Sequence, residues 1–221
     1  MSTCRIHPEG PVPDGQLLEQ LRGVPSSVAS DQMERFNFAK GIHRMTSPDL
    51  GITVGRAFTV RTRPGDNLVI YKAAEIAMPG DILVIDGGGA EDRALLGEIF
   101  YNHLVASKVG GLIIDGMIRD ATEIGMGPIP VFARGAAHPA PFKTGPGELR
   151  GPIAIGGTVV RQGDVIIGDA DGVAVVPIER LAAVTAGSLQ LIEDEKTKLA
   201  RAAAGEADTS FLETTLTIIE A

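Results

Sequence analysis

Hydrophobic and polar residues follow two different periods along this chain. The segment 54–64, VGRAFTVRTRP, alternates and is rich in β-branched residues, which predicts a strand. Apolar residues recur at helical spacing over 95–109, which predicts a helix that begins near Gly97. Uninterrupted apolar runs precede Asp86 and Asp115, and such runs are typical of buried strands. Together they predict a strand–helix–strand unit whose strands are parallel and connected in the right-handed sense.

Other segments extend this pattern in both directions. Helices are predicted over about 16–36, with a break in the middle, and over LVIYKAAEIAM. IPVFARG predicts a third short strand, and the three glycines 87–89 predict a loop after the first buried strand. Short apolar runs between 152 and 177 are separated by turns of two or three residues, which predicts antiparallel hairpins. A long amphipathic helix is predicted from 178 to about 205, followed by a tail with helical or extended potential.

The order of these elements predicts one α/β domain over residues 1–221, with a mixed sheet. A chain of this length buries a sizeable core in one domain. We expect the N-terminal helices at about 16–36, the core at about 54–177 and a C-terminal helical segment at about 178–221.

Composition and charge narrow the class of protein. The net charge is −8 and the basic residues are scattered, so we expect no nucleic-acid partner. A single cysteine, Cys4, excludes an intrachain disulfide and fits a reducing compartment, so the cytoplasm is expected. No apolar run approaches the length of a membrane span, and MSTCRIHPEG lacks the features of a signal peptide, so no membrane association is expected.

Charged residues gather where the two buried strands end. Glu98 lies at the start of the predicted helix, and Arg119 and Asp120 follow the second strand. Because the carboxyl ends of parallel strands open onto one crevice, we expect an arginine and two carboxylates to converge there. Motifs of serine hydrolases and nucleotide hydrolases are absent from the sequence, which therefore offers no support for either chemistry.

These residues predict a site for a small organic acid. A helix N-terminus presents free backbone N–H groups to an anion, and here they belong to Gly97, Glu98, Ile99 and Phe100. Arg119 can clamp the same anion with two hydrogen bonds. Asp120 then remains for a hard divalent cation, and one carboxylate with several waters is typical of Mg²⁺.

Each candidate also has a purely structural explanation. Asp120 and Glu123 have the spacing of a capping box, with Asp120 as the N-cap of a short helix. Glu98 is also an acid of the kind favoured in a first helical turn. Arg119 could serve only a surface ion pair, although such a pair contributes little to stability. Capping and coordination are compatible, because a carboxylate has two oxygens.

The acid, the twenty residues after it and the Arg-Asp pair form a signature, here Glu98, Arg119 and Asp120. Around it the chain resembles the family that groups 4-hydroxy-4-methyl-2-oxoglutarate and 4-carboxy-4-hydroxy-2-oxoadipate aldolases with the regulator of ribonuclease activity A. The resemblance covers about Val24 to Pro177. The matching blocks are SVASDQM, GDILVIDGGGAEDRALLGEIF, GLIIDGMIRDATEI and GDADGVAVVP.

The resemblance implies an α/β fold like that of swivelling phosphohistidine-type domains, in trimers or hexamers, with the active site near a subunit boundary. It implies that Asp120 binds Mg²⁺ or Mn²⁺ partly through waters, and that Arg119 and the amides from Gly97 to Phe100 hold the pyruvoyl part of the substrate. Glu98 organises a water that relays protons, although many members have aspartate there. Enzymatic members also take an acid from a neighbouring subunit, and Glu193 and Glu195 are the candidates in this chain.

The implied activity is that of a lyase. A metal-dependent aldolase cleaves a 2-oxo-4-hydroxy dicarboxylic or tricarboxylic acid to pyruvate and a second oxoacid, and the same enolate allows decarboxylation of oxaloacetate. The alternative is a non-catalytic regulator that binds and inhibits a ribonuclease. Such regulators tend to lack the metal-binding acid after the arginine, so Asp120 favours the enzyme.

Two other enzyme classes fit the sequence less well. A Schiff-base aldolase needs a buried lysine, and none of the six lysines lies in a predicted buried strand. LVIDGGG superficially resembles the glycine motif of methyltransferases and dinucleotide enzymes. Such folds need further strand–helix units, whereas hairpins are predicted after residue 150.

Overall fold

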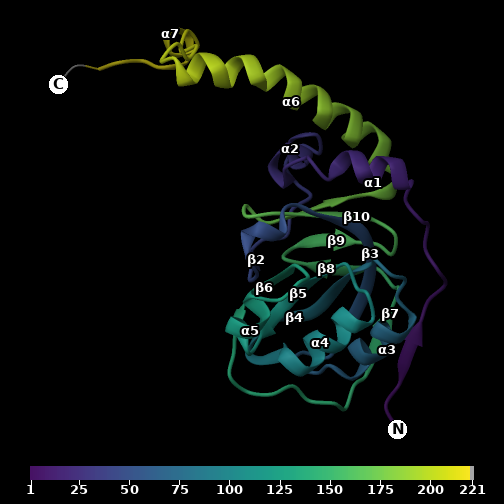
Figure 1. The fold of residues 1–221 in the computed structure, drawn as a ribbon. Coiled ribbons are helices and arrows are strands. Elements are labelled where there is room, and N and C mark those ends of the chain that lie inside the picture. The colour runs from purple at the N-terminus through teal and green to yellow at the C-terminus, as the bar shows by residue number, and fades with distance from the viewer. Residues whose placement is uncertain (220–221) are drawn as a thin grey trace.

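The computed structural model describes residues 1–219 and is built around a mixed sheet of nine strands (Figure 1). The strands of this sheet are β1 (Cys4–Ile6), β2 (His43–Arg44), β3 (Thr53–Thr62), β4 (Ile82–Leu96), β5 (Gly111–Ile118), β6 (Val131–Ala136), β7 (Gly147–Leu149), β10 (Val165–Gly168) and β11 (Val173–Val176). Two further strands, β8 (Ile153–Ile155) and β9 (Thr158–Val160), form a separate sheet. The helices are α1 (Gly15–Leu21), α2 (Ser26–Asp31), α3 (Leu68–Ile76), α4 (Glu98–Ala106), α5 (Ala121–Gly125), α6 (Leu181–Ala203) and α7 (Leu212–Thr215), with 3₁₀ turns at Pro48–Leu50 and Ile178–Arg180.

The centre of the sheet is parallel. Strands β3, β4, β5 and β6 lie side by side in that order, and α4 connects β4 to β5. Successive residues of β4 point to opposite faces, so Leu83 and Ile85 pack under α3 and α4, whereas Ile82 and Val84 pack toward β8 and β9. Both faces of these strands are buried, which explains their uninterrupted apolar runs. The predicted strand–helix–strand unit is confirmed.

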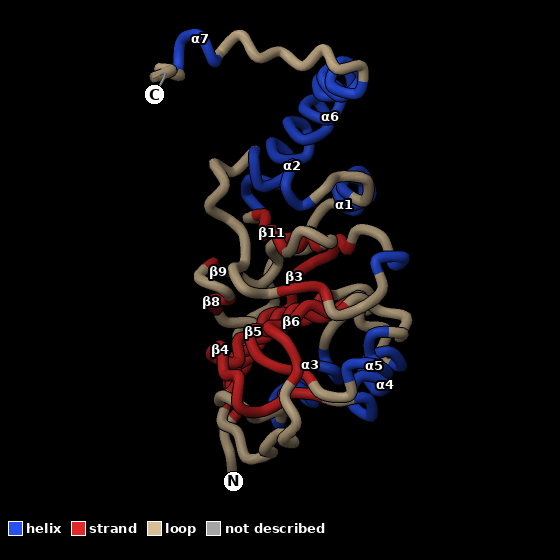
Figure 2. Tube along the Cα trace, turned by 90° about the vertical axis from the view of Figure 1, so that its left-hand side faces the viewer, coloured by secondary structure: helices blue, strands red, loops and turns tan. Residues whose placement is uncertain are grey.

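The later strands form the predicted antiparallel hairpins. Strand β8 pairs with β9 as a separate two-stranded sheet, and β10 pairs with both β11 and β3. Helices α1, α2 and α6 cover the outer face of β10 and β11 with a third apolar cluster that includes Leu21, Ile167 and Val184. Figure 2 shows these helices at one end of the molecule and α3, α4 and α5 at the other.

The glycine segment differs from its prediction as a loop. Strand β4 continues through Gly87, Gly88 and Gly89 to Leu96, although its register against β5 shifts three times. The residues from Asp86 to Leu96 lie opposite only Asp115 to Ile118. The additional residues of β4 therefore have no partner in β5 and form β-bulges. Gly88 and Gly89 permit this because both adopt positive φ values, of 71° and 65°. The bulges bring the end of β4 beside the end of β5.

The long C-terminal helix is confirmed as α6. Only its first residues are buried, at Leu181, Val184, Thr185 and Ser188, and the rest extends away from the sheet (Figure 1). The predicted tail contains the short helix α7, and its last two residues lie outside the described part of the chain. None of the helices within residues 1–219 combines the length and apolar character that crossing a membrane requires.

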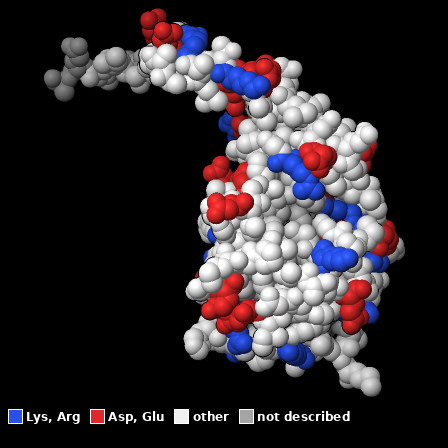
Figure 3. Space-filling view, viewed as in Figure 1, with Lys and Arg blue, Asp and Glu red and all other residues white. Residues whose placement is uncertain are grey.

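Acidic and basic residues are scattered among uncharged ones on the face in Figure 3, and basic residues do not gather into a patch there. This agrees with the scattered basic residues of the sequence.

Candidate active site

The ends of β4 and β5 bring the predicted site residues together. The Arg119 N–H donates to the carbonyl oxygen of Leu96 at 3.0 Å, which places Arg119 directly beside the start of α4. The Glu98 N–H donates to Oδ2 of Asp120 at 2.9 Å, and Nε of Arg119 lies 3.6 Å from the same oxygen. Arg119 and Asp120 therefore lie at the start of α4, and Glu98 takes part in this contact through its backbone N–H.

Asp120 does not form the capping box considered for its own helix. It precedes α5 in the left-handed conformation, with φ 53° and ψ 44°, and its side chain makes no capping hydrogen bond there. An N-cap side chain reaches its own helix from an extended backbone, which this conformation does not provide. The carboxylate instead caps α4, a helix from another part of the chain. Tertiary contact thus overrides the local spacing.

Asp120 also takes one of the four amides predicted to hold a ligand. The Glu98 N–H is occupied by Oδ2 of Asp120, which corrects the expectation that all four N–H groups from Gly97 to Phe100 are free. The N–H groups of Ile99 and Phe100 have no acceptor among residues 1–219. The Glu98 side chain is exposed and makes neither a hydrogen bond nor an ion pair within the same residues.

Arg119 lacks a full set of partners. Its Nε is buried and has no hydrogen bond in the described part of the chain, while 38% of its side chain is exposed. A buried donor without a partner costs about 1–3 kcal/mol. The exposed part of the side chain can still meet a ligand. The fork of Arg119 is therefore available for a carboxylate.

A cavity of about 190 Å³ lies against Arg119 and the first turn of α4. Such a volume suits a molecule smaller than a typical drug. It is lined by Asn67, Tyr71, Gly97, Ile99, Phe100, Arg119, Ala140, Pro141 and Lys143. A more open hollow of about 490 Å³ contains Asp120 and His138 and shares Arg119 with the cavity. Arg119 therefore borders both spaces.

A larger hollow of about 760 Å³ lies elsewhere, along β1 and β7, and contains none of the predicted site residues. Arg61 of this hollow already pairs with neighbours, since it lies 3.4 Å from Glu148 and 3.3 Å from Asp86. Arg119 instead combines a buried Nε that has no partner within residues 1–219 with a position beside Asp120 and a helix start, and we therefore place the site there.

Comparison with known proteins identifies the family of this chain. Residues 26–175 match the RraA-like family, described as Aldolase/RraA. The chain belongs to this family. A relative from Halalkalibacterium halodurans, provisionally named 4-hydroxy-4-methyl-2-oxoglutarate aldolase, is 38% identical over 162 residues, which are 73% of this chain and 76% of the relative.

Solved structures of RraA-like proteins share the fold. RraAS2 from Streptomyces coelicolor, described as an unusual member of the RNase ES inhibitor RraA family, has a TM-score of 0.76 at 24% identity and covers 86% of this chain and 99% of its own. The RNA-processing inhibitor RraA from Thermus thermophilis has a TM-score of 0.62 at 27% identity, over 69% of this chain and 92% of its own. The predicted RraA-like α/β fold is confirmed.

Three residues lining the cavity of this RraA-like protein were missed from the sequence: Asn67, Tyr71 and Lys143. Tyr71 stacks on Phe100 with a centroid distance of 3.8 Å, and Nζ of Lys143 lies 3.3 Å from the Tyr71 hydroxyl. Asn67 lies in the turn after β3, and Lys143 lies in the loop after β6. Both strands run parallel to their neighbours β4 and β5, so the rule that located Arg119 could have found these two residues as well.

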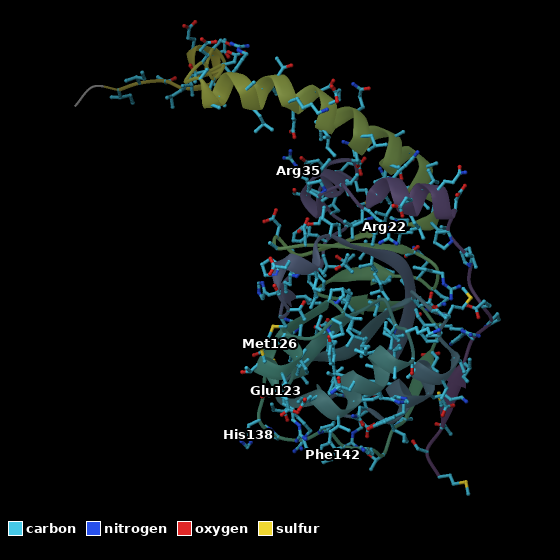
Figure 4. All side chains as sticks on the ribbon, viewed as in Figure 1. Arg22, Arg35, Glu123, Met126, His138 and Phe142 are labelled. Carbon is cyan, nitrogen blue, oxygen red and sulfur yellow. The ribbon has the colours of Figure 1, made fainter. Side chains whose placement is uncertain are left out.

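The loop that carries Lys143 connects β6 to β7 and is held in place by Asp66. This carboxylate is fully buried and accepts hydrogen bonds from the backbone N–H groups of Leu68, Thr144 and Gly145 and from the Thr144 hydroxyl. Burial acts to raise the pKa of Asp66, but these four donors together lower it below its ordinary value. Figure 4 shows His138 and Phe142 of this loop at the edge of the molecule.

Replacing Asp66 with asparagine is expected to lower the free energy of unfolding by roughly 2 kcal/mol at pH 7, because hydrogen bonds to a charged acceptor are lost. A carboxylate whose pKa is lowered by folding stabilises the protein fully above its unfolded value of about 3.9 and loses that effect as the pH falls through its own lower pKa. Urea unfolding of both proteins should therefore give a difference that narrows below about pH 4. A difference that stays constant down to pH 2.5 would contradict this role.

Gly97 keeps the site compact. A Cβ atom there would lie 2.4 Å from Oδ2 of Asp120 and 2.8 Å from Nε of Arg119. Its φ of −132° is accessible to any residue, so the obstacle is steric and not a matter of backbone conformation.

Replacing Gly97 with alanine is expected to reduce turnover about 10²-fold, because it displaces both charged side chains by a fraction of an ångström or more. The matched control is Gly23→Ala, where an added Cβ meets nothing within 4 Å. Steady-state kinetics of the two variants should differ, and equal activity would show that Arg119 and Asp120 need not be close to each other.

The donor set around Asp120 fits a hydrated divalent cation. Within residues 1–219 no three histidine, cysteine, aspartate or glutamate side chains gather as a ready-made cage. Asp120 nevertheless has one oxygen, Oδ1, free of hydrogen bonds in the described part of the chain, and 37% of its side chain is exposed. Mg²⁺ keeps several waters and needs only one or two carboxylates, whereas structural zinc needs four protein ligands.

Proposed function

We propose that this RraA-like protein is a lyase that needs a divalent metal ion, Mg²⁺ or Mn²⁺. Its substrate is a 2-oxo-4-hydroxy acid of the 4-hydroxy-4-methyl-2-oxoglutarate or 4-carboxy-4-hydroxy-2-oxoadipate type, and its products are pyruvate and a second oxoacid. The observation that carries the proposal is the meeting of Arg119, Asp120 and the first turn of α4, with Arg119 between the cavity and the open hollow that contains Asp120. The provisional name of the Halalkalibacterium relative supports the same activity.

Different residues bind the substrate, hold the metal ion and return the proton. The fork of Arg119 and the free amides of Ile99 and Phe100 bind the 1-carboxylate and 2-oxo end of the substrate. Asp120 would hold the metal ion, which when bound withdraws electrons from the 2-oxo group. Loss of the 4-hydroxyl proton and cleavage of the C3–C4 bond leave the enolate of pyruvate, and a water held by Glu98 returns a proton to C3. Decarboxylation of oxaloacetate gives the same enolate.

The proposed assembly is a homotrimer or homohexamer in which a neighbouring subunit supplies an acid. Glu193 and Glu195 lie on α6, at the opposite end of the molecule from α4 (Figures 1 and 2). They lie too far away to reach the site of their own chain, so any contribution from them would be made to a neighbour. Glu193 pairs only with Lys196 of its own helix in the described part of the chain.

The test is release of pyruvate, coupled to NADH oxidation by lactate dehydrogenase. We expect turnover of 4-hydroxy-4-methyl-2-oxoglutarate and of oxaloacetate with Mg²⁺, loss of both with EDTA, and recovery when Mg²⁺ or Mn²⁺ is restored. The likeness to the Thermus RNA-processing inhibitor favours a ribonuclease regulator as the second candidate. Absence of pyruvate release together with inhibition of a ribonuclease would support that candidate instead.

A further inference from the structure

Asn67 lies in the candidate site, and none of the hydrogen bonds that stabilise the surrounding fold in the described part of the chain involves its side chain. It precedes α3 at the N-cap position, yet its side chain makes no capping hydrogen bond. Its backbone is fully engaged, because the N–H donates to the Phe142 carbonyl at 3.0 Å and the carbonyl accepts from the Ile70 N–H at 3.1 Å. The residue is only 2% exposed, and its Oδ1 has no hydrogen-bond partner within residues 1–219.

Asn67, which carries this unpartnered acceptor, lines the same cavity as Arg119 and Lys143. Arg119, Lys143 and the first-turn amides of α4 bring donors to that cavity, and the Tyr71 hydroxyl, which can donate and accept, lies 3.3 Å from Nζ of Lys143. A carboxylate satisfies those donors but offers no proton to an amide oxygen. A hydroxyl group beside the carboxylates of a ligand would supply the proton that Oδ1 of Asn67 lacks.

We propose that Asn67 is a specificity-determining residue, whose carboxamide oxygen accepts a hydrogen bond from the 4-hydroxyl group of the substrate. The inference rests on the proposed function and deepens it, because it names the residue of the cavity that recognises the substituent at C4 of the substrate. Arg119 and the start of α4 hold the 2-oxo acid end, and Asn67 lines the same cavity from another segment of the chain, before α3.

A neutral carboxamide is too weak a base to take the hydroxyl proton, so Asn67 orients this group and another group removes its proton. The consequence is a preference among substrates. Oxaloacetate shares the 2-oxo acid end but has no 4-hydroxyl group, and it therefore gains nothing from Asn67. Sites that hydrogen-bond a substrate hydroxyl discriminate strongly against analogues that lack it.

The experiment compares kcat/KM for two substrates in wild type and Asn67→Ala, with Mg²⁺ present and after subtraction of the enzyme-free rate. We expect Asn67→Ala to lower kcat/KM for 4-hydroxy-4-methyl-2-oxoglutarate roughly 10- to 100-fold. For oxaloacetate the change should stay within about threefold, since no contact is removed. The ratio of the two values is the readout, and a merely structural role would lower both values alike.

Two further variants keep the test independent of folding. Asn67→Asp retains an acceptor oxygen, so both values should fall through repulsion of the substrate carboxylates while their ratio stays near that of wild type. Asn67→Leu fills nearly the same space without an acceptor, so it should shift the ratio as alanine does. The thermal midpoint of each variant is measured in parallel.

The outcomes separate the two levels of inference. Equal losses on both substrates, or an unchanged ratio in both Asn67→Ala and Asn67→Leu, would overturn the role of Asn67 while leaving the lyase intact. A wild-type protein that releases no pyruvate from either substrate would overturn the proposed function and this inference with it.

Discussion

Replacing Asp120 with asparagine is expected to lower kcat for pyruvate release about 10²- to 10³-fold at saturating Mg²⁺. Asparagine removes the negative charge that would hold the metal ion, and loss of one electrostatic group that stabilises a developing oxyanion has effects of this size. The side chain can still accept the Glu98 N–H, and asparagine tolerates the left-handed conformation found at this position. The fold should therefore survive the substitution.

Asp120→Ala is the harsher companion variant. It removes the charge and also the hydrogen bond that caps α4, and it places alanine at a φ of 53°. We expect a similar loss of kcat together with a loss of roughly 1–3 kcal/mol in the free energy of unfolding. Isothermal titration with Mn²⁺ and urea unfolding distinguish the two effects. Wild-type turnover by Asp120→Asn with unchanged Mn²⁺ affinity would exclude Asp120 as the metal ligand.

Arg119→Lys is expected to lower kcat/KM about 10²-fold. Lysine keeps the positive charge but replaces a planar fork by a single ammonium, which cannot form two parallel hydrogen bonds to a carboxylate. Nε of Arg119, buried at the contact with Asp120, would also be lost from the site. The prediction is checked with the coupled pyruvate assay and with inhibition by oxalate, a planar mimic of the enolate, which should weaken in parallel.

The matched control is Arg22→Lys. Arg22 is exposed, pairs with Glu19 of its own helix and lies at the far end of the molecule (Figure 4). An exposed ion pair of this kind contributes little, so activity and the free energy of unfolding should remain near wild type. Activity of Arg119→Lys within threefold of this control would show that charge alone suffices, which contradicts a bidentate clamp.

The amino-acid sequence by itself determined the main elements of the fold. Buried parallel strands must be apolar on both faces, so ILVI and GLII were recognisable as β4 and β5 without any knowledge of their neighbours. The helical spacing between them located α4, and short turns located the later hairpins. These patterns are local, because each element carries its own period of burial.

The same rule located Arg119 and Asp120. Residues that follow adjacent parallel strands share one edge of the sheet, so chain position and topology sufficed to place them beside the start of α4. The path of the chain between these points was not local. The glycine segment continues as a bulged strand because it pairs with β5, and pairing partners cannot be read from three glycines.

Only the tertiary structure decided what each side chain contacts. The spacing of Asp120 and Glu123 is that of a capping box, yet Asp120 bonds to Glu98, twenty-two residues away in the chain. Asn67 and Lys143 reach the cavity from the loops after β3 and β6, but only the packed structure shows which side chains of those loops line it. Periodicity reports which face of an element is buried, whereas hydrogen bonds depend on the positions of individual atoms, and the packing of distant segments sets those positions.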